Sequence, residues 1–226
     1  VSLAKSNKIK KLSIDIKDFL NLAKIQPEDL GRLLAENFEM ANFEFVRYKT
    51  KPKTGWNFVE EIHIQNASKE IQVGVEQGQV IGGEVNQCRA LANSPGGEMT
   101  PQKLAASAKN VAKVGKIKVT TLDRRGIANL KMGGILGVSK GSKEEPRFII
   151  MEYLSGPKTE KPVVLIGKGV TFDTGGLNVK TGDYMYEMHM DMSGAAAVIH
   201  AIAAAAKLGI KKNVIGLIPA VENMPS

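Results

Sequence analysis

Strand-like and helix-like patterns of apolar residues alternate over the second half of this chain. Alternating or continuously apolar stretches predict strands at 117–121, 135–138, 148–153, 163–166 and 214–218. Between them, apolar residues at helical spacing predict helices at 101–115, 123–131 and 194–208. Strands that alternate with helices predict an α/β fold with a mainly parallel or mixed sheet.

The first hundred residues follow a less regular pattern. It predicts a strand edge over 9–16, a helical turn around the apolar cluster at 19–22, a helix at 27–40, a strand at 56–64 and a helix at 68–91. The last helix contains several glycines, which weaken a helix. The four-residue spacing of Gly74, Gly78 and Gly82 favours close packing of this helix on a partner.

The stretch from Val163 to His200 concentrates the residues that can carry chemistry. Its first four residues predict a buried strand. A loop broken by glycines follows and holds four charged side chains: Lys168, Asp173, Lys180 and Asp191. Ligands in open α/β sheets gather beyond the carboxyl ends of strands, so we expect a site here. Gly175 and Gly176 would permit positive φ or a close approach of the backbone.

These residue types are typical of metal chemistry. Two neighbouring carboxylates can hold divalent cations around one water. A buried lysine beside a dication can lose its proton and become a ligand, and a second lysine that stays charged can stabilise an oxyanion. Taken singly, the same residues are more typical of solvated loop lysines and of turn or helix-start aspartates. The whole set in one order favours the metal interpretation.

The runs V-L-I-G-K-G-V-T-F-D-T-G-G-L-N-V-K and E-M-H-M-D-M-S-G-A-A-A-V closely resemble the catalytic core of the leucine aminopeptidase family, the cytosolic M17 peptidases. The resemblance implies two divalent metal ions, manganese or zinc with magnesium as a third candidate, that activate water to attack the first peptide bond. It implies that Lys168, Asp173 and Asp191 are metal ligands. It further implies that Lys180 is catalytic and contacts the substrate, and that Met188 lines the pocket for the substrate's first side chain.

The resemblance also implies a division of the chain. Residues 1–67 would be the end of a small α/β amino-terminal domain, 68–95 a linking helix and loop, and 96–226 the first part of the peptidase catalytic domain. The family completes its site with an N-T-D-A-E-G-R run, which supplies two more carboxylate ligands and a catalytic arginine. That run is not among these 226 residues. We therefore expect this fragment alone to be inactive.

Composition bears on the cellular compartment and on whether the cysteine and histidine residues are functional. Cys88 is the only cysteine, so no internal disulfide can form, which is typical of a reducing compartment such as the cytoplasm. We interpret Cys88 as a packed residue rather than a nucleophile. No apolar run approaches the ~20 residues of a membrane-spanning helix. We interpret His63, His189 and His200 as surface or packed residues rather than ligands.

Three functional hypotheses follow. The first is a leucyl aminopeptidase that releases amino-terminal residues, preferably leucine, from peptides and is a hexamer when full length, as the resemblance implies. The second is a DNA-binding relative, which the net charge of +8 permits but does not favour because the lysines are scattered along the sequence. The third is a non-catalytic relative with weak metal affinity and no peptidase activity.

Overall fold

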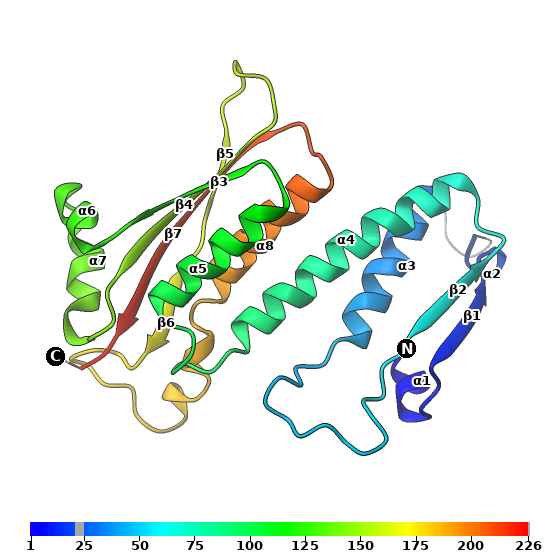
Figure 1. Cartoon of the computed structure of the whole chain (residues 1–226), viewed down its shortest axis with the longest axis horizontal. Helices are drawn as coiled ribbons and strands as arrows, with labels where there is room; N and C mark the ends of the chain where they lie inside the picture. Colours follow the sequence, from blue (N-terminus) through cyan, green and yellow to red (C-terminus); the bar gives the residue numbers. More distant parts are fainter. Residues whose placement is uncertain (21–24, 226) are drawn as a thin grey trace. The chain divides into compact units, whose positions relative to one another are not determined.

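The computed structural model describes residues 1–20 and 25–225 and divides into two compact units, Val1–Asn86 and Gln87–Ser226 (Figure 1). Helix α4 (Lys69–Ala92) runs from the first unit into the second. Within the described ranges, no helix combines the length and the apolar character that crossing a membrane requires.

The first unit is a small α/β assembly. Its elements before α4 are α1 (Ser2–Ser6), β1 (Lys11–Asp15), α2 (Lys17–Leu20), α3 (Pro27–Asn42) and β2 (Glu61–Gln65). Strands β1 and β2 are parallel, with Lys11 opposite Glu61. Ile16, Leu30 and Ile71 form its buried core. The strand and turn predicted for 9–22 are confirmed up to residue 20, and the remainder of that turn lies outside the described residues.

Helix α4 packs on α3 through its glycines, as their spacing predicted. A Cβ added at Gly74 would collide with the carbonyl oxygen of Glu28, and one added at Gly78 with that of Arg32. The two helix backbones are therefore in direct contact along this line. The predicted strand at 56–64 is shorter than expected, because only Glu61–Gln65 pairs with β1 and residues 56–60 are irregular.

The second unit is a mixed α/β domain. Its helices are α5 (Pro101–Val111), α6 (Arg124–Asn129), α7 (Gly133–Val138) and α8 (Ser193–Lys207), with short 3-10 turns at η1 (Ala112–Val114), η2 (Ser139–Gly141), η3 (Gly182–Met185) and η4 (Met188–Met190). Its strands are β3 (Ile117–Leu122), β4 (Arg147–Leu154), β5 (Val163–Ile166), β6 (Gly169–Asp173) and β7 (Asn213–Asn223). The α/β fold class predicted from the sequence is confirmed.

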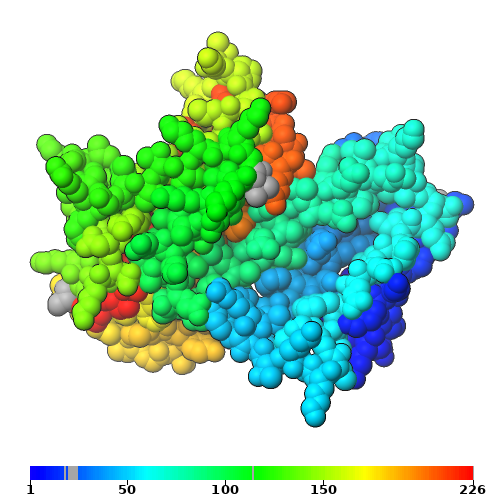
Figure 2. All heavy atoms as spheres, viewed as in Figure 1, coloured from blue at the N-terminus to red at the C-terminus, as the bar shows by residue number. Residues whose placement is uncertain are grey.

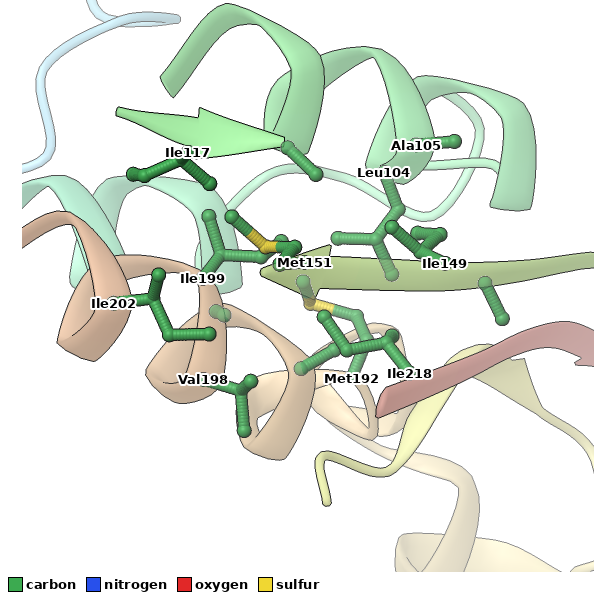
Figure 3. Close-up of a cluster of buried hydrophobic side chains, with 14 of the residues drawn as sticks. Leu104, Ala105, Ile117, Ile149, Met151, Met192, Val198, Ile199, Ile202 and Ile218 are labelled. Carbon is green, nitrogen blue, oxygen red and sulfur yellow. The ribbon is translucent and has the colours of Figure 1, made fainter. Parts of the chain in front are cut away.

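The sheet of this unit has the order β3-β4-β7-β5, and β6 also pairs with β7. Strand β4 is antiparallel to both of its neighbours, whereas β5 and β6 are parallel to β7. Helices α5 and α8 pack on the sheet and supply much of the core (Figure 3). Leu104 of α5 and Ile199 and Ile202 of α8 are fully buried with Met151 of β4 and Ile218 of β7.

Three further expectations from the sequence were wrong. Residues 169–173, expected to lie in a glycine-broken loop, form strand β6, which pairs with β7. Residues 135–138 form part of helix α7 instead of a strand. A short apolar run between glycines has the same composition in a helical turn and in a strand, so periodicity could not separate them. Strand β5 was expected to be buried, but Val163 is 54% and Ile166 74% exposed. The reason is that β5 lies at the sheet edge, where among the described strands it pairs only with β7.

Candidate metal centre

Strands β5 and β6 follow one another along the same side of β7. Strand β5 pairs with the first part of β7, and β6 pairs with the last part, where Asp173 stands opposite Asn223. The junction at Gly167 and Lys168 lies against the start of α8. There the Ala195 amide donates to the Lys168 carbonyl at 2.9 Å, and a Cβ on Gly167 would come within 2.6 Å of the Gly194 carbonyl oxygen. Glycine at 167 and 194 permits this close approach.

This approach brings Lys168 next to Asp191, which precedes α8. The Lys168 ammonium donates to Asp191 Oδ1 at 2.7 Å and lies 2.6 Å from Oδ2. The Asp191 side chain is 19% exposed, and its Oδ2 is fully buried without a hydrogen bond of ordinary geometry from any described residue. A buried carboxylate oxygen with spare acceptor capacity fits a cation ligand.

Asp173 lies at the carboxyl end of β6 and has three donors. Asn223 Nδ2 donates to its Oδ1 at 2.6 Å, the Gly175 amide donates to the same oxygen at 2.9 Å, and Lys180 Nζ lies 2.9 Å from Oδ2. Burial alone would raise the pKa of Asp173, but the donors from Lys180, Gly175 and Asn223 together lower it to about 2. Asp173 is therefore ionised at neutral pH and available to a cation.

The loop after Asp173 positions Lys180. Gly175 and Gly176 have φ of +91° and +68°, as expected for glycine, and the Lys180 amide donates to the Thr174 carbonyl at 2.8 Å. The Lys180 ammonium lies between Asp173 Oδ2 and the Met188 sulfur, 2.8 Å away. An open pocket of about 480 Å³ borders this pair and is lined by Asn178, Val179, Lys180, Thr181, Tyr184 and Met188.

The remaining candidate groups lie elsewhere. His200 is buried within α8, and His189 is in η4 beside Met188. Cys88 is half-buried in α4, and burial raises the pKa of its thiol. In the described part of the chain, no three His, Cys, Asp or Glu side chains come together in a group that could hold a metal ion. The described residues form two separate pairs, Lys168 with Asp191 and Lys180 with Asp173, and no third carboxylate joins either pair.

Sequence reasoning missed Asn223. Its side chain contacts Asp173 directly, and its carbonyl accepts hydrogen bonds from both the amide and the hydroxyl of Thr174, at 2.9 and 2.7 Å. The signal that could have found it is strand order, because two parallel neighbours bring their carboxyl ends to one edge. That order was not available from local patterns.

The mixed α/β fold of the second unit is that of an M17 peptidase catalytic domain. Residues 86–226 match the model described as the cytosol aminopeptidase family, catalytic domain. The chain belongs to the cytosol aminopeptidase family.

Curated relatives extend the match beyond this domain. A probable cytosol aminopeptidase of Chlorobaculum tepidum is 39% identical over 224 residues, which cover 93% of this chain and 44% of the relative. One of Ralstonia nicotianae is 46% identical over 159 residues, covering 70% of this chain and 31% of the relative. The chain thus spans less than half the length of these relatives.

Solved structures agree on the fold. The bottromycin maturation enzyme BotP in complex with Mn superposes with a TM-score of 0.82 at 28% identity, covering 100% of this chain and 48% of that one. The cytosol aminopeptidase of Coxiella burnetii superposes with a TM-score of 0.78 at 24% identity, covering 96% and 43%, and is evidence for the fold alone.

Proposed function

We propose that this chain carries part of the site of a metal-dependent aminopeptidase that removes amino-terminal residues from peptides. The observation that carries the proposal is the pairing of each of two carboxylates with a lysine, Asp173 with Lys180 and Asp191 with Lys168, inside the segment that matches the family. In this proposal residues 1–67 belong to an amino-terminal domain, 68–95 link the domains, and 96–226 begin the catalytic domain.

Lys168, Asp173 and Asp191 would hold divalent ions, two of them in the complete site. The buried Oδ2 of Asp191, whose close charged neighbour is the Lys168 ammonium, and the ionised Asp173 fit such ions. Manganese is favoured because the similar BotP structure is a complex with Mn. Zinc and magnesium are the other candidates. When bound, such ions supply an activated water and polarise a carbonyl. The described carboxylates are too few to complete two sites, so further ligands must come from outside them.

Lys180 would stabilise the oxyanion that forms at the attacked carbonyl. Its ammonium lines the pocket and is held by Asp173 and Met188, and a fixed positive charge there needs little reorganisation during the reaction. The pocket beside it combines Val179, Tyr184 and Met188, which suits an apolar first side chain such as leucine.

Metal binding to the 226-residue chain tests the ligand assignment. Free Mn²⁺ can be followed by electron paramagnetic resonance during a titration. We expect Asp173→Asn and Asp191→Asn each to weaken binding at least ~10-fold, because each removes a charged ligand. Asp183→Asn is the matched control, since this aspartate is exposed in η3 of the same loop and should not change affinity. Equal affinity in all three variants would refute the assignment.

Hydrolysis of leucine 4-nitroanilide with Mn²⁺ tests the activity. We expect the 226-residue chain to be inactive, because its ligand set is incomplete. In any chain that carries the remaining ligands, we expect Lys180→Ala to reduce turnover. A complete chain with equal turnover in Lys180→Ala would remove Lys180 from the mechanism.

We also propose a cytoplasmic homohexamer for the complete protein, which light scattering after size-exclusion chromatography tests.

A second candidate function, binding to nucleic-acid phosphates, rests on the distribution of charge alone. Residues 1–86 contain as many acidic as basic residues, so the net charge of +8 lies entirely in the second unit. Exposed lysines gather at the end of its sheet where β3 and β7 begin, opposite the end that carries Asp173; they are Lys109, Lys113, Lys116, Lys118, Lys158, Lys161, Lys207, Lys211 and Lys212. Scattered in sequence, they share one surface in the fold.

Two acidic side chains lie among these lysines: Glu152 pairs with Lys118, and Glu160 pairs with Lys212. The loop 155–162 projects from this end of the unit (Figure 2). Arginine and aromatic side chains are missing from the set, so contacts would be to the phosphate backbone and not to bases.

The salt dependence of DNA affinity tests this second function. Replacing Lys158, Lys161 and Lys211 together by Ala should reduce the slope of log affinity against log salt by about 3, because fewer counterions are released. The triple Lys49, Lys51 and Lys53 variant, in an exposed loop of the first unit, is the matched control. If both triple variants change the salt slope equally, or if the chain does not bind DNA at all, this lysine surface is not a DNA-binding site.

A further inference from the structure

Asn223 closes the last pair of the parallel register between β6 and β7, opposite Asp173. Its Nδ2 donates to Asp173 Oδ1 at 2.6 Å, and the Gly175 amide donates to the same oxygen at 2.9 Å. A carboxylate oxygen offers two lone-pair sites. These two donors therefore occupy Oδ1 and leave the remaining acceptor capacity of the carboxylate on Oδ2, where the Lys180 ammonium at 2.9 Å takes up part of it.

We propose that Asn223 is a positioning residue that fixes the rotation of the Asp173 carboxylate, so that Oδ2 is the oxygen presented to the metal ion. The inference rests on the proposed function, because it requires Asp173 to be a metal ligand. Without the side-chain amide of Asn223, the Asp173 carboxylate could rotate about χ2 and present either oxygen to the metal ion. Holding one orientation before binding avoids that entropy loss when the ion arrives.

The surroundings hold Asn223 itself in place. Its carbonyl accepts the amide and hydroxyl of Thr174, which ties the residue to the start of the loop. Gly176 packs against its side chain, since a Cβ there would lie 2.7 Å from Asn223 Oδ1. An alanine at 176, besides being strained at φ +68°, would push the amide away from Asp173.

A purely structural role predicts a different result from a positioning role. The strands β6 and β7 are already paired through their backbones, so loss of the side chain alone removes little from the sheet. Asn213, at the opposite end of β7, offers the comparison. Its amide donates to the carbonyls of Pro157 and Glu160, far along the strand from Asp173, and it supports only the loop there.

The experiment is a Mn²⁺ titration of the 226-residue chain, followed by electron paramagnetic resonance, with a thermal melt of each variant. We expect Asn223→Ala to weaken Mn²⁺ binding 10- to 100-fold, the usual effect of removing a group that orients a ligand. We expect Asn213→Ala to lower the melting temperature and leave the affinity unchanged. Asn223→Ser, whose hydroxyl is too short to reach Oδ1, should lose as much affinity as Asn223→Ala and serves if the alanine variant does not fold.

The outcomes separate this inference from the proposed function. If the unmodified chain binds Mn²⁺ and both Asn223 variants bind it equally well, the positioning role is wrong and the ligand assignment stands. If Asn223→Ala and Asn213→Ala lose affinity equally, the effect is one of general stability and the positioning role is again overturned. If the unmodified chain does not bind Mn²⁺, the proposed function fails and this inference with it.

Discussion

Replacing glycine by alanine is expected to have opposite effects on stability at two positions of helix α4. At Gly78 a Cβ would collide with the carbonyl oxygen of Arg32 and lie 2.7 Å from the Cβ of Ala35, both on α3. At Gly83, five residues along the same helix, no atom lies within 4 Å of an added Cβ. Neither glycine has positive φ. Gly78→Ala and Gly83→Ala therefore differ in packing alone.

The free energies of unfolding follow from two opposing effects. Alanine stabilises a helix interior by about 1 kcal/mol relative to glycine, and Gly83→Ala should gain most of this. At Gly78 the same gain is opposed by overpacking, which costs about 1–3 kcal/mol. We expect the upper end, because the obstructing atoms are backbone and Cβ atoms that move only if α3 moves. Gly78→Ala should thus destabilise the first unit by about 2 kcal/mol.

Trp56 makes the assay specific to this unit. It is the only tryptophan and lies within residues 1–86, so its fluorescence reports unfolding of the first unit during heating. A change of 1 kcal/mol shifts the melting temperature of a domain this size by about 4–8 °C. We expect a rise of about 4 °C for Gly83→Ala and a fall of about 10 °C for Gly78→Ala. Equal shifts in the two variants would refute the close contact between α3 and α4.

Three further results are expected. The pKa of Asp173 is about 2 in the folded chain against 3.8 for an ordinary aspartate, so its ionised form should stabilise the fold by up to about 2 kcal/mol above pH 4. This contribution should be lost as pH falls from 4 towards 2, and an Asp173→Asn chain with the same loss of stability over that range would contradict the assignment. Thr100→Ala should cost about 1 kcal/mol in urea unfolding, because the Thr100 side chain accepts the Lys103 amide at 3.3 Å and caps α5, whereas Thr100→Ser should be nearly neutral. The Cys88 thiol, whose pKa burial raises, should react with a disulfide reagent at pH 7 much more slowly in the folded chain than in urea, and equal rates would show that α4 is open there.

The parts of the fold that could be predicted are those set by local chemistry. Thr100 followed by Pro101 predicted the start of α5, and the alanine-rich run after Gly194 predicted α8, because caps and apolar periodicity act within a few residues. The exposure of β5 could not be predicted. A run of four apolar residues indicates a strand, but whether neighbours cover that strand depends on the order of strands in the sheet.

In the candidate site too, the local sequence predicts which residues take part, whereas the fold decides how they are paired. Lys168, Asp173, Lys180 and Asp191 could be selected from their types and order, and their roles remain predictions. Their pairing could not, since it depends on the Gly167–Gly194 contact and on the register that sets Asp173 opposite Asn223. Both are long-range features. Asn223 is 50 residues from Asp173, and its role is visible only once the strands are aligned. A register shift of one residue would turn its side chain to the other face of the sheet and leave Asp173 Oδ1 with the Gly175 amide alone.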